Sequence, residues 1–368
     1  MGSNPSRPMN EPETIPMPPK APEQGAQPTM IKTVVAQHDA GAQVVTAPSA
    51  PSAIRAFLQA KSSGRLADGA FAGLMLICAL GVFAIVLLIL FVLISNSRLS
   101  IHAFGFKFFA SKAWDPVSGE FGAMPFVYGT VLSSLLAVVM AVPLALAVSI
   151  FLLDICPKAL QGPISFLTEL LAAIPSVVYG LWAIFVLVPL LHNYVNPLLI
   201  KVLGWTGLFT APDFGIGMFA AGVILAIMIL PIISSLTREV MSAVPHAQRE
   251  AVLALGATRW EMIRIGVLRN ARIGIVGGVI LGLGRALGET MAVAMVIGSS
   301  PTISKSLLAP AATMASVIAN EFAEAADDTY RSALIEIGLA LFLVTIVVNI
   351  LARLLVWAVT RGAPARAA

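Results

Sequence analysis

The chain has 368 residues, of which 58% are hydrophobic and 11% are charged, and its net charge is +4. Soluble domains are about 45–50% apolar and about 25% charged, so this composition excludes an ordinary soluble domain. Six segments are long and apolar enough to cross a hydrocarbon core of ~30 Å. They are residues 69–94, 127–153, 166–191, 216–236, 272–298 and 333–359. We therefore expect an all-α membrane protein with six transmembrane helices.

The first 65 residues differ from the rest of the chain. They are rich in Pro, Ala, Gln and Ser and nearly free of aromatic residues, so they cannot bury enough apolar surface to become ordered. We expect residues 1–65 to be a disordered tail, residues 66–361 to form the six-helix domain and residues 362–368 to be a short second tail. We expect no signal peptide, because the first span begins deep in the chain and is too long for the apolar region of one.

Lys and Arg residues set the expected orientation, because cytoplasmic loops carry an excess of them. They cluster before the first span, between spans four and five and after span six, whereas the opposite side has fewer and adds several Asp and Glu residues. Both termini and the segment 238–270 should therefore be cytoplasmic. The net charge is then a topology signal, and no basic stripe alternates with aromatic residues, so we expect no nucleic-acid partner.

The sequence contains none of the motifs typical of a membrane enzyme. It has no HExxH, no GxSxG and no cluster of Cys and His residues, so it indicates neither a metal site nor a hydrolase nucleophile. The two cysteines, Cys78 and Cys156, are too few for a disulfide framework. GxxxxGK followed by Ser or Thr is also absent. We therefore expect that this chain does not hydrolyse ATP by itself and binds no metal or cofactor.

The segment 238–270 predicts a helix–turn–helix at the cytoplasmic membrane surface. Pro245 suits the first turn of a helix, and an apolar stripe follows at helical spacing: Ala247, Ala251, Ala254 and Leu255. Gly256 ends this helix, since glycine readily adopts the left-handed conformation found at helix ends. Thr258 and Glu261 have the spacing of a capping box, which begins a second helix. Such a segment either receives a partner protein or is a connection that docks on its own bundle.

Span five contains an arginine and a glutamate, Arg285 and Glu289, near its middle. A charge at the bilayer centre costs roughly 2.5–3.5 kcal/mol on insertion scales, so each needs a partner, a wet cavity or a function. Spaced i,i+4, the two lie on one face of the predicted helix and can form an ion pair. Two interpretations remain open. Arg285 lies in the path of an anion, with Glu289 holding the guanidinium, or the two residues form a structural ion pair.

Several other residues of the spans are notable. Glu169 near the end of span three is expected to be a structural or gating acid, and Pro143 and Pro175 each remove a helical hydrogen bond. Small residues recur at four-residue spacing along span five in two stripes: Gly274, Gly278 and Gly282, and Gly284, Gly288 and Ala292. We interpret both stripes as surfaces of close helix packing.

Part of the segment 238–270 resembles the EAA loop of ABC-importer permeases, EAA-x3-G-x9-I-x-L-P in outline. The matching residues are Glu250-Ala251-Val252, Gly256-Ala257, Ile265 and Leu268, while Val252 replaces the second alanine and Arg269 stands where the proline usually falls. The resemblance implies a type I ABC importer permease-like fold, in which the loop is a coupling helix that sits in a groove of a separate ATPase. The residues implied to contact that ATPase are Glu250, Ala251, Leu255, Gly256 and Ala257.

Three further stretches resemble the phosphate-specific branch of these permeases, the PstC type. They are ELLAAIPSVVYGLW (residues 169–182), GLGRALGETMAV (residues 282–293) and ANEFAEA (residues 319–325). The similarity runs from about residue 65 to 360. It implies a subunit of a bacterial inner membrane that forms part of the path for inorganic phosphate. The expected path residues are Arg285, Glu289, Glu169, Thr290 and Ser176.

The resemblance also implies partners. These are a PstA-like permease subunit, a dimer of ATP-binding subunits that binds the ATP and Mg²⁺, an extracytoplasmic phosphate-binding protein and membrane lipid. A permease for another oxyanion, such as molybdate or sulfate, is the alternative within the same class. A secondary transporter is the alternative from a different class, and the coupling segment argues against it.

Overall fold

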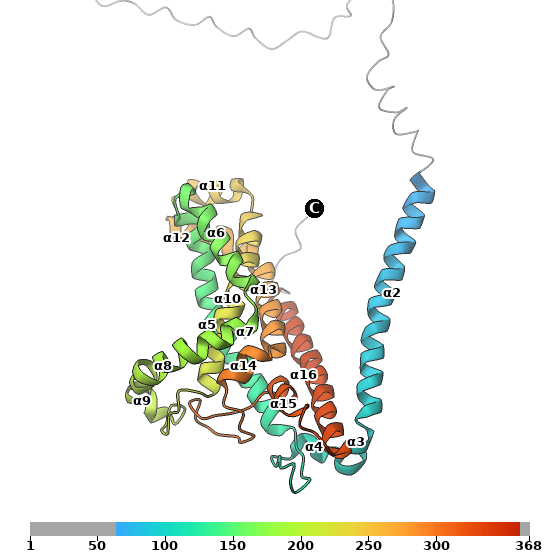
Figure 1. Ribbon diagram of the computed structural model, residues 1–368. Coiled ribbons are helices and arrows are strands. Elements are labelled where there is room, and N and C mark those ends of the chain that lie inside the picture. The colour runs from blue at the N-terminus through green and yellow to red at the C-terminus, as the bar shows by residue number, and fades with distance from the viewer. Residues whose placement is uncertain (1–63, 361–368) are drawn as a thin grey trace, which may run out of the picture. The chain divides into compact units, whose positions relative to one another are not determined.

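The computed structural model describes residues 64–360, and this part of the chain is helical, without strands (Figure 1). The chain divides into two units, Met1–Gly73 and Leu74–Ala368. Of the first unit, residues 64–73 are described, and they form the first turns of helix α2. The tails expected at residues 1–65 and 362–368 therefore lie almost wholly outside the described residues.

The helices follow one another along the chain with several short interruptions. They are α2 (Gly64–Asn96), α3 (Arg98–Phe104), α4 (Lys107–Ala110), α5 (Met124–Ile150), α6 (Lys158–Ala173), α7 (Ser176–Trp182), α8 (Val188–Leu190), α9 (Asn196–Leu203), α10 (Met218–Ser242), α11 (His246–Ala254), α12 (Arg259–Glu261), α13 (Arg269–Gly288), α14 (Met291–Val296), α15 (Met314–Glu321) and α16 (Asp328–Thr360). Wider, π-helical turns continue α5, α7, α8 and α12: Phe151–Ile155, Ala183–Leu187, Leu191–Val195 and Met262–Leu268. A 3₁₀ turn, Gly204–Thr206, follows α9.

Six helical stretches of the described chain are long and apolar enough to cross a membrane. They are Asp68–Asn96, Met124–Ile155, Ser176–Thr206, Met218–Ser242, Arg259–Gly288 and Asp328–Leu354. The all-α class and the six predicted spans are thus confirmed, with α11 and α12 lying between the fourth and fifth spans as expected. Two span boundaries differ from the prediction, and both differences concern candidate site residues.

The third span begins later than predicted, because the helix breaks before it. α6 ends at Ala173, and Ile174 and Pro175 are extended, with ψ of 130° and 140°. Proline lacks an N–H and pushes the residue before it out of the helical region, so Pro175 ends α6 instead of kinking a longer helix. The predicted span 166–191 therefore began too early: residues 166–173 belong to α6, and the span itself starts at Ser176. The Leu171 carbonyl, which cannot be bonded by Pro175, accepts hydrogen bonds from the Ile174 N–H at 3.4 Å and from the Tyr179 hydroxyl at 2.7 Å.

The main core is built around α10, which packs against both α5 and α13. Small residues let α5 approach closely, since Ala137, Ala141 and Ala145 are fully buried and a Cβ on Gly222 would meet the Leu136 side chain at 2.5 Å. The α13 glycines Gly274, Gly278 and Gly282 face α10 in the same way. Cβ atoms added there would lie 2.5, 3.3 and 2.8 Å from side chains of α10. The packing function predicted for this stripe is thereby confirmed.

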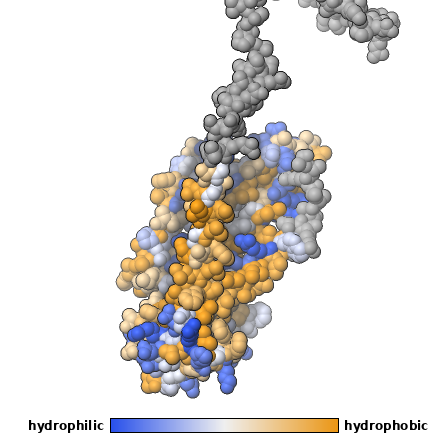
Figure 2. All heavy atoms as spheres, turned by 90° about the vertical axis from the view of Figure 1, so that its right-hand side faces the viewer, coloured by the Kyte–Doolittle hydropathy of each residue, from blue (hydrophilic) through white to orange (hydrophobic). Residues whose placement is uncertain are grey.

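A second buried cluster joins α4, α5, α15 and the beginning of α16. At its centre Trp114 and Tyr330 both donate hydrogen bonds to one carboxylate oxygen of Glu321, at 2.9 and 2.6 Å. Outside these clusters, large apolar side chains are exposed along the helices, for example Leu80 and Leu88 of α2 and Ile350 of α16. Figure 2 shows one such face, largely hydrophobic. Exposed apolar helices of this length are expected where lipid or another subunit covers the surface.

Candidate functional site

The predicted fifth span ends earlier than expected, at a break inside the glycine-rich motif. α13 ends at Gly288, Glu289 is extended with ψ of 129°, and α14 begins at Met291. The prediction of one helix over residues 272–298 was therefore wrong. Glycine is a poor helix former and often marks a helix end. In addition, the Glu289 carboxylate accepts a hydrogen bond of 3.4 Å from the Ala292 N–H, and so caps the start of α14.

The break separates the two charges that were expected to pair. Arg285 stays in the last turn of α13, whereas Glu289 lies beyond its end. The described residues provide no ion pair and no hydrogen bond for the Arg285 guanidinium. The structural ion pair between Arg285 and Glu289 was therefore a wrong interpretation for this chain. Arg285 is exposed instead and lies within electrostatic reach of the Tyr179 hydroxyl on α7.

Arg285 lines a cavity of about 470 Å³ between α13 and α16. Its α13 wall includes Gly277 and Gly284, and its α16 wall includes Asn349 and Arg353. A neighbouring cavity of about 920 Å³ shares Gly284, Asn349 and Arg353 and extends past Gly288. No Asp or Glu is among the described residues that line either cavity. The linings are mostly apolar, and Arg285, Arg353 and Asn349 bring positive charge and hydrogen-bonding groups into them.

The second small-residue stripe of the motif faces these cavities. Cβ atoms placed on Gly284 or Gly288 would meet nothing within 4 Å. The close packing predicted for these two glycines was therefore wrong within this chain. They leave the backbone of α13 bare along the cavity, whereas Ala292 of the same stripe is fully buried in the main core.

Ser176 and Thr290 each stand where a half-helix begins. Ser176 is the first residue of α7, directly after the break at Pro175. Thr290 directly precedes α14, and its hydroxyl donates a hydrogen bond of 3.3 Å to the Gly288 carbonyl. α7 and α14 pack closely, since a Cβ on Gly180 would lie 2.5 Å from the Met295 sulfur. The two broken helices therefore meet. Neither Ser176 nor Thr290 lines the Arg285 cavity.

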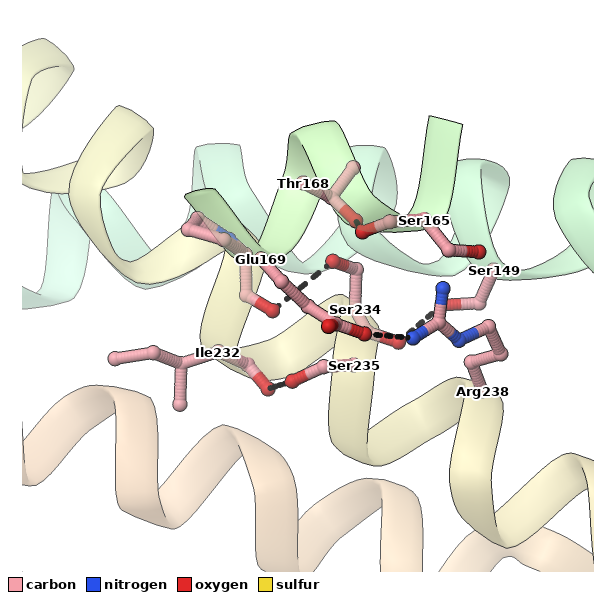
Figure 3. A network of polar contacts seen from close by, with 9 residues as sticks. Ser149, Ser165, Thr168, Glu169, Ile232, Ser234, Ser235 and Arg238 are labelled. Atoms are coloured by element: carbon pink, nitrogen blue, oxygen red, sulfur yellow. Dashed lines mark hydrogen bonds and ion pairs between the residues drawn. The ribbon is translucent and has the colours of Figure 1, made fainter. Parts of the chain in front are cut away.

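Glu169 has a partner that the sequence did not indicate. Its carboxylate accepts a hydrogen bond of 2.7 Å from Arg238, which joins α6 to α10 (Figure 3). The Arg238 side chain is 19% exposed and that of Glu169 58% exposed. Nearby, the Ser149 hydroxyl of α5 donates a hydrogen bond of 2.9 Å to the Ser234 carbonyl of α10. Glu169 does not line the Arg285 cavity, and its negative charge is paired with the positive charge of Arg238.

The helix–turn–helix between the fourth and fifth spans has the local geometry that the sequence predicted. Gly256 has a φ of +83°, the left-handed conformation that glycine adopts readily. Thr258 and Glu261 form the capping box, with the Glu261 N–H donating to the Thr258 hydroxyl at 3.3 Å. α12 then continues through a π-helical turn into α13, so the second helix and the fifth span are one continuous element.

The predicted ATPase-contact residues lie on the outer surface of α11 and its turn. Glu250, Ala251, Leu255 and Gly256 are exposed, and Ala257 is half-buried. Leu255, a large apolar side chain, is 89% exposed. The connection is also anchored to its own bundle, because Val252 turns inward against Gly266. The segment therefore docks on its own bundle with one side and leaves the other side exposed, so the two predicted alternatives do not exclude each other.

An ion pair that the sequence analysis missed holds α11 to the transmembrane helices. Arg249 donates a hydrogen bond of 2.8 Å to Asp154, in the π-helical turn that continues α5. It donates another, of 2.9 Å, to the Met241 carbonyl of α10. In the sequence, Arg249 is one of several Arg residues between spans four and five, and nothing in their pattern distinguishes it. Asp154 follows a long apolar run directly, and this isolated acid was the available signal.

Arg353 was missed in a comparable way. It lies inside the last apolar stretch with hydrophobic residues on either side, which is the same signal that singled out Arg285. As for metals, the described residues contain no group of three or more His, Cys, Asp or Glu side chains that could hold an ion.

Comparison with known proteins gives consistent matches. The model of the family described as "Binding-protein-dependent transport system inner membrane component" matches residues 156–361. A phosphate transport system permease protein PstC of Mesorhizobium japonicum is 48% identical over 265 residues, covering 71% of this chain and 81% of its own length. A PstC of Haemophilus influenzae is 46% identical over 282 residues, covering 76% and 89%. A probable PstC of Methanocaldococcus jannaschii is 35% identical, covering 73% and 87%.

Among solved structures, the inward-facing methionine ABC transporter MetNI is similar with a TM-score of 0.47 and 18% identity. That match covers 64% of this chain and 94% of the transporter chain.

Proposed function

Because this chain belongs to the family of binding-protein-dependent transport system inner membrane components, and within it to the phosphate permeases of the PstC type, we propose that it forms part of the membrane path for inorganic phosphate. It is a multi-pass membrane protein and a permease subunit, not an ATPase. Import is driven by a separate ATPase subunit, which binds ATP and Mg²⁺. The membrane is the inner membrane of a bacterial cell, and both termini are cytoplasmic.

The observation that carries this proposal is the state of Arg285. Its guanidinium lies in a spanning helix, lines a cavity and has no ion pair with a described residue. A charge at this depth is rare unless it pairs or serves a transported species. The guanidinium offers a permanently charged planar fork that binds two oxygens of a phosphate at once. An anion that passes through the cavity provides the counter-charge that the chain itself lacks.

The other path candidates have different functions in this proposal. Glu169 acts as a gating acid through its ion pair with Arg238, and it does not bind phosphate, which a carboxylate repels. Thr290 and Ser176 remain candidate hydroxyl ligands at the two half-helix starts. Glu289 fixes the beginning of α14 after the break, since its carboxylate caps that helix.

The surface of α11 is the proposed docking site for the ATPase. Of the candidate contact residues there, Glu250, Ala251 and Gly256 match specified positions of the EAA pattern, and Leu255 and Ala257 flank its glycine. An apolar side chain as exposed as Leu255 suits burial in a partner's groove. The complete importer has this chain, a PstA-like permease subunit, two ATP-binding subunits and an extracytoplasmic phosphate-binding protein, surrounded by membrane lipid.

Reconstitution of the complete importer in liposomes tests the proposal. We expect ATP-dependent uptake of radiolabelled phosphate, no uptake without ATP, and no ATP hydrolysis by the purified chain alone. Leu255→Asp should abolish uptake by releasing the ATPase, whereas Leu253→Asp, at a less exposed position of the same helix, is the matched comparison. Preferred uptake of sulfate or molybdate would identify a different oxyanion. Uptake driven by an ion gradient without ATP would identify a secondary transporter.

A further inference from the structure

A second arginine, on α16, lies at the end of the sixth span. Arg353 lines both the 470 Å³ cavity that contains Arg285 and the neighbouring 920 Å³ cavity. Its side chain is exposed, and no ion pair or hydrogen bond links it to a described residue. The two cavities thus adjoin at Arg353, and Asn349 and Gly284 also line both.

The polar residues of α16 are arranged along one face. Thr345, Asn349 and Arg353 follow at i, i+4 and i+8, and all three line the larger cavity. Opposite them, α13 presents the bare backbone of Gly277, Gly284 and Gly288. From Gly277 to Gly288 this wall extends about 16 Å along the helix. Polar side chains of α16 therefore face a wall of α13 in which these glycines alternate with Ile280, Leu281 and Arg285.

The charge around these cavities is unbalanced. Arg285 lines the smaller cavity and Arg353 lines both, and no described Asp or Glu lines either one. Unpaired cations in a low-dielectric region repel each other and attract any anion that enters. Each cavity is much larger than the ~30 Å³ that one water occupies in the liquid, so each has room for a partly hydrated small anion.

We propose that Arg353, with Asn349 beside it, forms a second anion station in the path, which phosphate occupies on its way past Arg285. This inference rests on the proposed function and extends it by naming the second ligand set. Asn349 donates one N–H to the Thr345 carbonyl at 2.9 Å, which orients its amide and leaves the other N–H for an oxyanion. Conduction requires that no single site hold the ion too tightly, and two sites in sequence meet this requirement.

Arg353 has a different explanation that makes contrasting predictions. Long basic side chains near a helix end extend to the lipid headgroups and anchor the helix. An anchor affects how much protein inserts, and it has no dependence on phosphate. Substitution of a residue that binds the transported anion lowers uptake while the abundance of the protein stays the same. Bound phosphate also protects such a residue from chemical modification.

The first test compares uptake by the complete importer with Arg353→Gln, Arg353→Lys and Arg98→Gln. Arg98 is an exposed arginine on α3 outside both cavities, and it forms no ion pair with a described residue. At equal abundance in the membrane we expect Arg353→Gln to lower phosphate uptake by about tenfold or more, Arg353→Lys to retain part of it, and Arg98→Gln to match the wild type. Equal uptake by Arg353→Gln and the wild type would overturn the proposal. Absence of phosphate uptake by the wild-type importer would instead overturn the proposed function.

The second test restores the charge chemically. In a Cys78→Ser, Cys156→Ser background, Arg353→Cys is treated with methanethiosulfonate reagents that attach either an ethylammonium or an ethylsulfonate group. We expect the ammonium to restore uptake and the sulfonate to leave it low. Saturating phosphate should slow modification of the cysteine at 353 and leave modification of Arg98→Cys unchanged. Equal modification rates with and without phosphate, or equal rescue by both reagents, would contradict a station for anions.

Discussion

Arg249 in α11 and Asp154 at the end of α5 form an ion pair of 2.8 Å, and their side chains are only 14% and 10% exposed. One Asp154 oxygen and the Arg249 Nε have no further hydrogen-bond partner among the described residues. A buried pair with incomplete hydrogen bonding contributes little net stability as a unit, whereas loss of one partner leaves an uncompensated buried charge. The pair therefore fixes the position of α11 more than it stabilises the fold.

This arrangement predicts a non-additive pair of substitutions. Arg249→Met and Asp154→Leu should each destabilise the protein by about 3–5 kcal/mol, and the double variant should be close to the wild type. Thermal unfolding of the purified importer in detergent measures all three. Asp328→Asn is the matched control, because its pair with Arg331 is long, at 3.8 Å, and largely exposed, so a change within about 1 kcal/mol is expected. Additive losses in the double variant would show that the two residues act separately.

A second prediction concerns the turn after α11. Proline cannot adopt the φ of +83° observed at Gly256, so Gly256→Pro should reorient the exposed face of α11 while the transmembrane helices still insert. We expect ATP hydrolysis that is no longer linked to phosphate uptake, measured as the ratio of the two rates in liposomes. Gly162→Ala is the control, because Gly162 lies within helix α6 with open space around it. An unchanged ratio in Gly256→Pro would mean that this segment is only a connection.

A third prediction follows from the separation of Arg285 and Glu289. Because no ion pair joins them, Glu289→Gln should not relieve the effect of Arg285→Gln on assembly. We expect the double variant to assemble with its ATPase and to be defective in phosphate uptake. Arg285→Lys keeps the charge but loses the bidentate fork, so uptake should fall more than assembly. Recovery of uptake in the double variant would restore the structural ion pair as the explanation.

The two glycine stripes of α13 provide a fourth, internally matched prediction. Gly274→Ala places a methyl group 2.5 Å from Val240, and overpacking of this kind costs about 1–3 kcal/mol. Gly284→Ala meets open space and gains helix propensity of up to about 1 kcal/mol. Unfolding of the purified chain should therefore rank Gly284→Ala as the more stable variant.

Uptake separates the two stripes further. Gly284→Leu fills the bare wall of the cavity, so it should lower phosphate uptake while the subunits still assemble. If Gly284→Leu instead prevents association with the second permease subunit, the bare glycine face is a packing surface between subunits and not a wall of the path.

The sequence predicted the fold well where a local pattern determines the structure. Apolar length alone identified the six spans, and the residues at Gly256, Thr258 and Glu261 were sufficient to predict a left-handed helix end and a capping box. These features depend on neighbouring residues and on backbone geometry, so no knowledge of tertiary structure is needed to infer them.

The candidate site was harder to predict, because it depends on how helices interrupt and face one another. The i,i+4 spacing of Arg285 and Glu289 implied a pair only if the helix continued, and a glycine followed by a capping carboxylate ended it. Whether a glycine faces α10 or open space, as for Gly282 and Gly284, is decided by tertiary packing. The partner of Glu169 lies 69 positions along the chain, and no local pattern indicates such a contact.

Helix α6 contributes no buried side chain. It is connected at both ends, to the turn Phe151–Ile155 and through the extended residues Ile174 and Pro175 to α7, and it packs on α10. The polar contacts that hold it, the part-exposed ion pair of Glu169 and the Tyr179–Leu171 hydrogen bond, are worth about 1 kcal/mol each. A neighbouring subunit can therefore shift α6 without exposing a buried side chain of that helix, and so at little expense to the folding stability of the chain.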